Sequence, residues 1–349
     1  MRILVTGSTG NVGTRVLTAL AGDPSVDSVV GIARRAPGVV EPGTEFIAAD
    51  VAGDELEPLL RGADVVIHLA WLIQPGRDER VTERVNVEGS RRVFDAAVRA
   101  GVGAIVYASS VGAYAPGPKD REVDESWPAT GIASSFYSRH KAATERLLDA
   151  LEREHPAVRV VRLRPGLIFQ RAAATEIRRL FIGPLLPGAL ARPQLIPFVP
   201  EHPRLRVQAV HADDVADAYR RAAVSDARGA FNIASAPVLD GAVLASLLGA
   251  HTVPVSHRLL RAAASLSFTL RVQPTEPGWV DMAFGVPLLD SGRARRELGW
   301  SPAVSADDAV LELLDGLRSS TDGPTPPLAR STTGPLRWRE LVTGVGRRV

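Results

Sequence analysis

Residues 1–13 read MRILVTGSTGNVG, and this stretch decides the expected fold. Its apolar, β-branched start predicts a short strand, and apolar residues at helical spacing follow the glycines. Gly7, Gly10 and Gly13 lie between the two, where glycine lets the backbone turn sharply and approach a phosphate. The start of the following helix offers free N–H groups to that phosphate. The stretch therefore predicts the pyrophosphate-binding turn of a dinucleotide site, with a glycine turn that binds no ligand as the alternative.

The rest of the chain alternates between strand and helix patterns. Strands are expected at 28–33, 45–48, 64–69, 104–108, 158–162 and 230–233, and helices at 54–61, 79–100, 137–154 and 211–223. This alternation predicts an α/β fold, a Rossmann-type doubly wound parallel sheet with its ligand at the C-terminal edge. We expect residues 1–165 to form mainly the dinucleotide-binding Rossmann domain. Residues 166–318 would form mainly a smaller C-terminal substrate-binding subdomain and return some strands and helices to the Rossmann core.

Three segments outside this pattern carry signals of their own. Residues 183–203 hold many prolines, which predicts loops over a site. Residues 256–272 combine arginines with leucines and alanines, which predicts a helix packed on the domain, with a membrane-surface helix as the alternative. Residues 319–349 are rich in Pro, Gly, Ser and Thr, which predicts a loosely packed C-terminal tail.

Composition narrows the functional classes. The 349 residues are 45% hydrophobic, and 41 basic against 39 acidic residues give a net charge of +2, so no nucleic-acid partner is expected. The absence of cysteine excludes disulfides, thiol catalysis and cysteine-ligated metals. The chain starts directly in a strand and has no uncharged run of about 18 residues, so we expect neither a signal peptide nor a membrane partner. The expectation is a cytoplasmic protein that binds a small molecule, and a homodimer stays open.

Only two of the basic residues are lysines, Lys119 and Lys141. Lys119 lies in the loop sequence APGPKDREVDE, where we expect a solvated charge. Lys141 lies four residues after Tyr137 in YSRHK, so the two side chains share one face of a helix. An ammonium near a phenol lowers the pKa of that phenol, which predicts Tyr137 as a general acid or base. The compact lysine charge also suits a hydrogen bond to a ribose hydroxyl.

Ser109 and Ser110 follow the strand expected at 104–108, at the sheet edge where a substrate would lie. A serine hydroxyl there can hold the oxygen that gains or loses a proton. Each signal alone occurs by chance in many chains, and serines after strands are common. The order of glycine turn, strand-end serines and YxxxK is what indicates a site.

Taken in this order, the motifs resemble those of the extended short-chain dehydrogenase/reductases, the NAD-dependent epimerase/dehydratase family. The resemblance covers about residues 1–315. The matching segments are TGSTGNVG (6–13), AADV (48–51), VIHLA (66–70), NVEGSRRVFDAA (86–97), VYASSVGAY (106–114), YSRHK (137–141), RLRPGLIF (162–169), VHADDVADA (210–218), FNIAS (231–235) and LDSGRARRELGWSP (289–302). The combination is specific for the family and much less so for the substrate.

The resemblance implies roles for individual residues. Tyr137 would be the catalytic acid/base, Lys141 its electrostatic partner, and Ser110 the donor to the substrate oxygen. Asp50 and Val51 would flank the adenine. The residues expected at the cofactor are Gly7, Thr9, Gly10, Asn11, Val12, Gly13, Asp50, Val51, Leu69, Ala70, Asn86, Ser109, Tyr137, Lys141 and Pro165.

The end of the second expected strand indicates the form of the cofactor. NAD-specific sites carry Asp or Glu there, which accepts hydrogen bonds from the ribose 2′-OH. Here Ala33 takes that place, Arg34 and Arg35 follow, and no acidic residue occurs between Asp27 and Glu41. A guanidinium can bind a 2′-phosphate that a carboxylate would repel. We therefore expect NADP(H) as the preferred cofactor and NAD(H) as the second option, with solvent-facing arginines as the alternative.

Departures from the family pattern concern the substrate. Val111 and Gly112 stand where the sugar-nucleotide dehydratases of this family carry an Asp-Glu pair, so elimination of water from a sugar is not expected. Gly166 falls in the run where many sugar-nucleotide epimerases have Asn, and Arg206 lies close to, but not at, the place of their diphosphate-binding arginine. These differences argue against a UDP-sugar substrate.

The sequence thus predicts an NAD(P)-dependent oxidoreductase that transfers a hydride between nicotinamide and a carbinol or carbonyl carbon of a small organic substrate. An epimerase of sugars or sugar nucleotides with retained cofactor is the first alternative. A non-catalytic NAD(P)-binding sensor is the second, although a sensor would not need Ser110, Tyr137 and Lys141. His68 and His211 lack metal-ligand spacing, so no metal is predicted.

Overall fold

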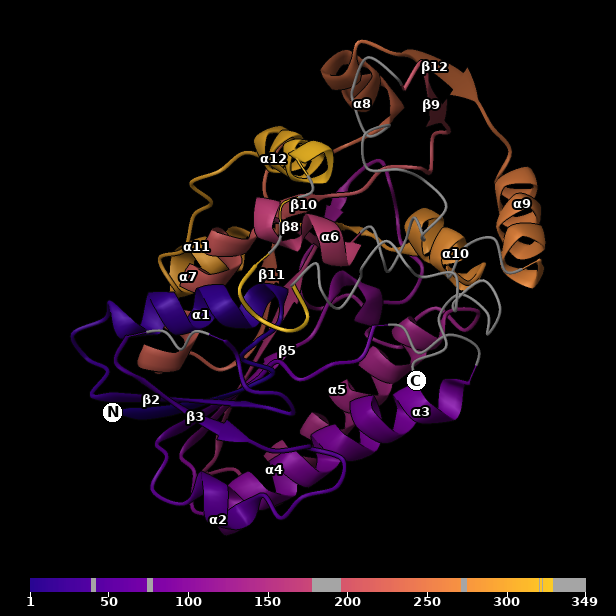
Figure 1. Cartoon of the computed structure of the whole chain (residues 1–349). Helices are drawn as coiled ribbons and strands as arrows, with labels where there is room; N and C mark the ends of the chain where they lie inside the picture. The colour runs from indigo at the N-terminus through magenta and orange to yellow at the C-terminus, as the bar shows by residue number, and fades with distance from the viewer. Residues whose placement is uncertain are drawn as a thin grey trace.

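Seven parallel strands form the central sheet, in the order β11-β7-β5-β4-β1-β2-β3 (Figure 1). The computed structural model describes residues 1–38, 42–73, 78–177, 196–270, 275–319, 321 and 323–328. The strands are β1 (Arg2–Thr6), β2 (Ser28–Ala33), β3 (Thr44–Ala48), β4 (Val65–His68), β5 (Ala104–Ala108), β7 (Arg159–Pro165) and β11 (Gly229–Ile233). The predicted Rossmann-type doubly wound parallel sheet is confirmed. Because all strands run the same way, every one of their carboxyl ends lies at one edge.

Helices cover both faces of this sheet, as the apolar character of its strands requires (Figure 1). Ile3 and Val5 of β1 belong to the cluster under α1 (Asn11–Ala21) and α7 (Ala212–Val224), whereas Leu4 belongs to the cluster on the other face. That second face is covered by α2 (Glu57–Leu60), α4 (Gly89–Arg99) and α5 (Phe136–Glu154). Successive side chains of β1 therefore point to opposite faces of the sheet and pack against both helical layers.

The helix expected at 79–100 is divided in three by a π-helical turn. It consists of α3 (Glu79–Glu83), the π turn η1 (Arg84–Glu88) and α4. Asn86 lies in the π turn with none of its side chain exposed. Its Oδ1 accepts from the backbone N–H of Leu72 at 2.7 Å and its Nδ2 donates to the carbonyl of Leu72 at 2.9 Å. The widened turn thus gives the segment after β4 a fixed position.

The remaining elements form a smaller layer beyond the C-terminal edge of the sheet (Figure 1). They are η2 (Val111–Ala113), β6 (Glu122–Val123), β8 (Leu167–Phe169), η3 (Arg171–Ala173), α6 (Ala174–Ile177), β9 (Phe198–Glu201), β10 (Ala209–His211), α8 (Gly241–Leu248), β12 (His251–Pro254), α9 (His257–Thr269), α10 (Gly278–Gly285), β13 (Leu288–Leu289) and α12 (Ala306–Ser319). The helix α11 (Gly292–Glu297) instead packs against β11, in the same core cluster as α1 and α7. Three two-stranded pairs join β10 to β8, β12 to β9, and β13 to β6.

Two segments differ from their expected structure where the structure describes them: the segment 183–203, expected to form loops, and the tail after residue 319, expected to be loosely packed. Of the proline-rich segment, residues 183–195 lie outside the described chain, but β9 pairs in parallel with β12 and does not form a loop. Within the C-terminal tail, Leu328 is 1% exposed and the Thr325 hydroxyl donates to the carbonyl of Thr9 at 2.7 Å. The expectation of loose packing is therefore wrong for residues 323–328, because one leucine and one hydroxyl anchor them on the glycine turn.

Lys119 is buried, and the expectation of a solvated charge is wrong. Its side chain is 4% exposed, and its Nζ donates to the carbonyls of Arg206 at 2.6 Å and Ala283 at 2.9 Å. Burial, together with the charges of Arg204 and Arg206, lowers the pKa of Lys119 to about 7. The lysine joins its own loop to α10 and to the segment before β10, which positions the outer layer.

The expected helix at 256–272 corresponds to α9, which packs on α10. None of its residues is fully buried, and Leu259 and Leu266 are 66% and 61% exposed. Asp281 of α10 fixes the helix, because it pairs with His257 and with Arg261, each at 2.9 Å. Among the described residues, no helix combines the length and apolarity needed to cross a membrane.

A buried ion-pair network joins α5 to β7. Glu145 of α5 has 2% of its side chain exposed and accepts from Nε and Nη2 of Arg164, both at 2.8 Å. Arg162 also reaches Glu145, at 3.2 Å, and the Ser109 hydroxyl donates to it at 2.5 Å. Burial alone would raise the pKa of Glu145, but the two guanidiniums and the serine outweigh it, so the pKa lies below its usual value.

Removal of this charge should destabilise the fold. We expect Glu145→Gln to lower the free energy of unfolding by about 3 kcal/mol, because Arg164 and Arg162 would keep buried charges without their partner. Folding lowers the pKa of Glu145 from its ordinary value of 4.5, so the difference from wild type should shrink as the pH falls below that value. Denaturant unfolding at several pH values measures both effects.

Glu152→Gln serves as the matched control. Glu152 also pairs with Arg162, but 35% of its side chain is exposed. We expect a loss of under about 1 kcal/mol there, since exposed pairs contribute little. Equal losses in the two variants would contradict a special role for the buried carboxylate.

Candidate active site

The glycine turn after β1 has the geometry that a pyrophosphate needs. Gly7 adopts a φ of +73°, and a Cβ there would lie 2.6 Å from the backbone nitrogen of Ala70. A Cβ on Gly13 would lie 2.3 Å from the carbonyl oxygen of Gly7. Gly10 is the N-cap of α1, and no side chain caps this helix. The first N–H groups of α1 are therefore left for a ligand, and the turn fits a dinucleotide pyrophosphate.

Residues around the turn hold it in place. The Gln170 amide nitrogen donates to both the carbonyl and the Oδ1 of Asn11, each at 2.7 Å. Arg15 in turn donates to the Oε1 of Gln170 at 2.7 Å. Thr9 and Asn11 were expected at the cofactor, and the structure uses their backbone carbonyls for these supporting contacts with Thr325 and Gln170.

The residues expected beside the adenine end of the cofactor lie after β2 and β3. Arg34 and Arg35 directly follow β2 and are both exposed. Asp50 follows β3, and its Oδ1 accepts from the backbone N–H of Ala52 at 2.9 Å. Val51 is 5% exposed and packs under Gly89, where a Cβ would come within 3.1 Å of it. The sheet thus brings the arginines and Asp50 to the same edge as the glycine turn.

Ser110, Tyr137 and Lys141 come together at the ends of β5 and α5. Tyr137 lies in the first turn of α5, which is capped by the Ser135 hydroxyl. The Ser110 side chain lies close enough to the Tyr137 phenol to act on its pKa, and the Ser110 hydroxyl accepts from the N–H of Gly112 at 3.0 Å. The Lys141 ammonium donates to the carbonyl of Ala108 and lies 5.7 Å from the centroid of the Tyr137 ring.

The expected effect of Lys141 on the pKa of Tyr137 is not what the structure shows. Burial raises the pKa of Tyr137 to about 12, and the nearby Ser110 lowers it only in part. Burial lowers the pKa of Lys141, and the nearby Glu145 carboxylate opposes that shift. The sequence expectation was wrong because it considered the charge of the ammonium without the loss of solvent around both groups.

Trp71 is a site residue that the motifs did not indicate. The Lys141 ammonium lies 3.5 Å from the centroid of its indole ring, and the Tyr137 ring lies 6.0 Å away, edge-on. Its indole nitrogen is buried and has no hydrogen-bond partner among the described residues. The sequence could have indicated this residue by its position, because Trp71 directly follows VIHLA at the end of β4.

The helix α10 supplies two further residues that were missed. The Trp279 and Tyr137 ring centroids are 5.0 Å apart. A Cβ on Gly112 would lie 2.9 Å from Cε1 of Tyr137 and 3.1 Å from Sδ of Met282. The sequence could have indicated these two residues by their spacing, because Trp279 and Met282 are three residues apart and so lie on one helical face. Gly112 therefore leaves the space that the tyrosine ring occupies.

Three expected cofactor residues support the site from behind. The Ser109 hydroxyl is committed to Glu145, and both groups of the Asn86 amide bind Leu72, so neither polar side chain is left for a ligand. Pro165 is buried at the end of β7, where it pairs with Ile233 of β11. These residues position the loops that carry Ser110, Leu69 and Ala70.

His68 and its surroundings form a neutral polar network. Its Nδ1 lies 2.7 Å from the Thr6 hydroxyl and its Nε2 lies 2.9 Å from the Ser90 hydroxyl. Burial, with a smaller effect of Lys141, lowers the pKa of His68 to about 3, so the ring is uncharged at neutral pH. Within the described ranges, no three His, Asp or Glu side chains are grouped closely enough to hold a metal ion.

A family model agrees with this geometry. The model for the NAD-dependent epimerase/dehydratase family matches residues 3–234, from the glycine turn to β11. The chain belongs to this family. The match includes the strands and loops that carry the glycine turn, Ser110, Tyr137 and Lys141.

Two proteins of similar sequence come from Mycobacterium tuberculosis, and both are described as uncharacterized. The uncharacterized protein Rv2047c of Mycobacterium tuberculosis (strain H37Rv) is 28% identical over 321 residues, which cover 91% of this chain but 30% of that protein. The chain thus spans under a third of that relative. The uncharacterized protein Rv0501 of the same strain is 26% identical over 357 residues, covering 99% of this chain and 90% of that one.

Solved structures share the fold. The Thermus thermophilus UDP-glucose 4-epimerase in complex with NAD superimposes with a TM-score of 0.67 at 22% identity, covering 92% of this chain and 100% of that one. MoeE5 in complex with UDP-glucuronic acid and NAD gives 0.66 at 22% identity over the same shares. At this identity the likeness concerns the arrangement of the chain.

Adding a methyl group at Gly112 should disturb the centre of the site. We expect Gly112→Ala to lower the free energy of unfolding by about 1 to 3 kcal/mol, because the new Cβ would overlap with Tyr137 and Met282. Near-ultraviolet circular dichroism should change as well, since Tyr137 contacts Trp71 and Trp279. Gly53→Ala is the control, because no atom lies within 4 Å of the Cβ built there. Similar behaviour of the two variants would show that Gly112 is not constrained.

Proposed function

We propose that this protein is an NADP(H)-preferring oxidoreductase that transfers a hydride between nicotinamide and a carbinol or carbonyl carbon of a small organic substrate. The observation that carries the proposal is the contact of Ser110 with Tyr137, one helical turn from Lys141, at the sheet edge that also holds the glycine turn. A protein that only sensed the cofactor would need the glycine turn alone. The bound nicotinamide would supply the hydride acceptor or donor.

The residues of this chain would handle the proton. Tyr137 is protonated at neutral pH, as a phenol ordinarily is, and burial raises its pKa further, to about 12, so in reduction its hydroxyl can give a proton to the substrate oxygen. The Ser110 hydroxyl, held by the N–H of Gly112, would bind the same oxygen. Lys141, held by its donation to the carbonyl of Ala108, would in its charged form offset part of the cost of the phenolate that forms when the proton leaves, a cost that burial makes high. In oxidation the steps reverse, and the phenolate must form first.

An epimerase with retained cofactor is the second candidate. Its support is the likeness to solved 4-epimerases in complex with NAD, one of which also holds UDP-4-deoxy-4-fluoro-glucuronic acid. Two arginines of the outer layer argue against a bound diphosphate, because Arg204 donates to the carbonyl of Gly117 and Arg206 to that of Lys119. Calorimetric titration of the cofactor-loaded protein with UDP-glucose separates the two, and binding in the micromolar range would favour the epimerase.

The cofactor preference rests on Arg34 and Arg35. Both are exposed directly after β2, and no carboxylate precedes them on that strand. This environment suits a 2′-phosphate better than a free ribose hydroxyl pair. We propose NADP(H) as the cofactor and NAD(H) as the weaker ligand.

The acid–base role predicts the kinetics of three variants. We expect Tyr137→Phe and Lys141→Met each to lower turnover by at least about 100-fold, in the range of general acid–base effects. Lys141→Arg should not restore activity, because a planar guanidinium cannot take the place of a buried ammonium under Trp71. Oxidation by the wild type should rise with pH, since burial raises the pKa of Tyr137 to about 12. A screen of carbonyl compounds with NADPH absorbance as the readout supplies the substrate, and wild-type turnover by Tyr137→Phe would refute the assignment.

The cofactor preference predicts a ratio of dissociation constants. We expect wild type to bind NADPH more tightly than NADH at fixed ionic strength, and Arg34→Ala to reduce the ratio by about tenfold, the effect of one charged hydrogen bond. Arg61→Ala is the matched control, since Arg61 is also exposed but pairs with Glu57 at the opposite edge of the sheet. Tighter binding of NADH by the wild type, or an unchanged ratio in both Arg34→Ala and Arg35→Ala, would rule out the preference.

A further inference from the structure

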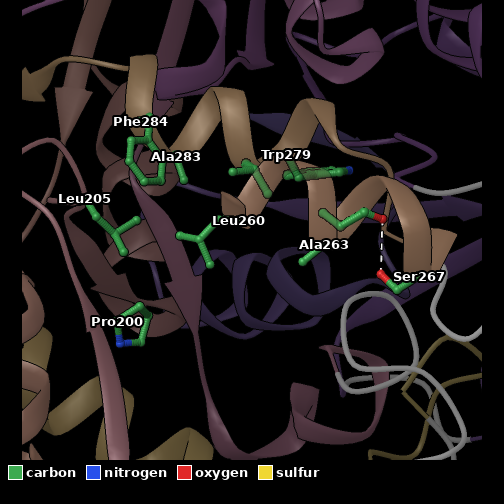
Figure 2. A pocket seen from close by; sticks show the side chains of 10 residues that line it. Pro200, Leu205, Leu260, Ala263, Ser267, Trp279, Ala283 and Phe284 are labelled. Carbon is green, nitrogen blue, oxygen red and sulfur yellow. Dashed lines mark hydrogen bonds between the residues drawn. The ribbon is translucent and has the colours of Figure 1, made fainter. Parts of the chain in front are cut away.

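An apolar groove lies beside the proposed active site, between α9, α10 and the chain around β9 (Figure 2). Its volume is about 600 Å³, within the range of small-molecule sites. It is lined by Pro200, Leu205, Leu260, Ala263, Ala264, Ser267, Trp279, Val280, Ala283 and Phe284. We propose that this groove binds a hydrocarbon group of the substrate, so that the substrate is an alcohol, aldehyde or ketone with a long or bulky apolar group. The inference rests on the function proposed above.

The lining has no charge to offer a ligand. All of the lining side chains are apolar apart from the Trp279 indole and the Ser267 hydroxyl. That hydroxyl donates to the carbonyl of Ala264 in its own helix, at 3.1 Å (Figure 2). Arg261, which follows the lining residue Leu260 on α9, pairs with Asp281. A phosphate or a sugar placed here would lose its hydrogen bonds to water without compensation, whereas a hydrocarbon would gain from leaving water.

Trp279 connects the groove with the proposed catalytic group. It lines the groove, and its ring lies 5.0 Å from that of Tyr137. Met282 and Val111 pack against Tyr137 in the same apolar cluster. Trp279 is thus shared by the apolar cluster around Tyr137 and by the lining of the groove. A substrate whose oxygen meets Ser110 and Tyr137 can extend a hydrocarbon group past Trp279 into the groove.

The composition of α9 keeps the groove open. Ala263 and Ala264 face it, while Leu259 and Leu266 of the same helix are 66% and 61% exposed. A helix that served only to cover α10 would gain by turning these two leucines inward, because each buried leucine stabilises the fold. The inner face carries Leu260 together with the small residues Ala263, Ala264 and Ser267. This arrangement leaves a volume that an apolar ligand can fill.

The test uses straight-chain alcohols and aldehydes as probes. Alcohols from butanol to decanol are titrated calorimetrically into the full chain loaded with NADPH, with which an alcohol cannot react. We expect the dissociation constant to fall about three- to fourfold for each added methylene. The aldehydes of the same lengths are then tested as substrates: the aldehyde carbon gains the hydride as NADPH is oxidised, and the oxygen gains the Tyr137 proton.

Two pairs of variants on adjacent residues of α9 localise the effect. Both alanines are exposed in the free protein, but only Ala263 lines the groove. We expect Ala263→Asp to weaken decanol binding by at least about tenfold, since a bound hydrocarbon would take water away from the new carboxylate, and Ala263→Phe to shorten the longest chain that binds. Ala262→Asp and Ala262→Phe should behave like wild type.

The outcomes separate this inference from the function on which it rests. Affinity and aldehyde turnover that both rise with chain length and fall in the Ala263 variants would support it. Turnover of short carbonyl compounds without any dependence on chain length would overturn the groove and leave the oxidoreductase standing. Alcohol binding without turnover of any aldehyde would show that the hydrocarbon is not part of a substrate and would overturn the inference together with the proposed function.

Discussion

The carboxylate of Glu145 accepts hydrogen bonds from Ser109, Arg164 and Arg162 in the interior between α5 and β7. These partners come from two parts of the site's support, because Ser109 follows β5 and precedes Ser110, whereas both arginines belong to β7. A buried carboxylate is stable only where such donors surround it, so the network admits little displacement of α5 along the sheet. Lys141 and Tyr137 stand one and two turns before Glu145, and their positions follow from that anchor.

Burial sets the protonation of the proposed catalytic pair in opposite directions. It raises the pKa of the Tyr137 phenol and lowers the pKa of the Lys141 ammonium, which favours the neutral form of both. The Glu145 carboxylate opposes the lowering of the Lys141 pKa, and the nearby Ser110 opposes the rise of the Tyr137 pKa. A neutral phenol is the form that can donate a proton, so this environment suits carbonyl reduction at neutral pH. The same burial makes Tyr137 a poor base until the pH rises.

Much of the central sheet could be predicted because its signals are local. The runs 28–33 and 104–108 coincide with β2 and β5, since continuous β-branched segments bounded by turns leave few alternatives. Strand ends could also be assembled into one site, because parallel topology places them at the same edge. The fate of Lys119 could not be predicted in this way. Its burial depends on contacts with the carbonyls of Arg206 and Ala283, which lie far along the chain. The sequence around Lys119 does not indicate these contacts.

The same limit applies to the residues that surround Tyr137. Trp71 and Trp279 reach the tyrosine from segments about two hundred residues apart in the chain, which only the folded structure brings together. The π turn around Asn86 likewise follows from a contact with Leu72 and not from helical periodicity, which is continuous through 79–100. Long-range packing therefore decided which aromatic side chains belong to the site.

The glycine at position 112, where the family's dehydratases carry an acidic residue, affects how the neighbouring side chains pack. An acidic side chain at this position would enter the space of the Tyr137 ring and of Met282. With glycine there, Tyr137 packs against Val111, Met282 and Trp279, and its surroundings become apolar. Tyr137 is half-buried, and the loss of water around its phenol raises its pKa. Trp279 of this cluster also lines the groove between α9 and α10. Glycine at position 112 thus both leaves the site without a second acid and lets Tyr137 pack among apolar side chains.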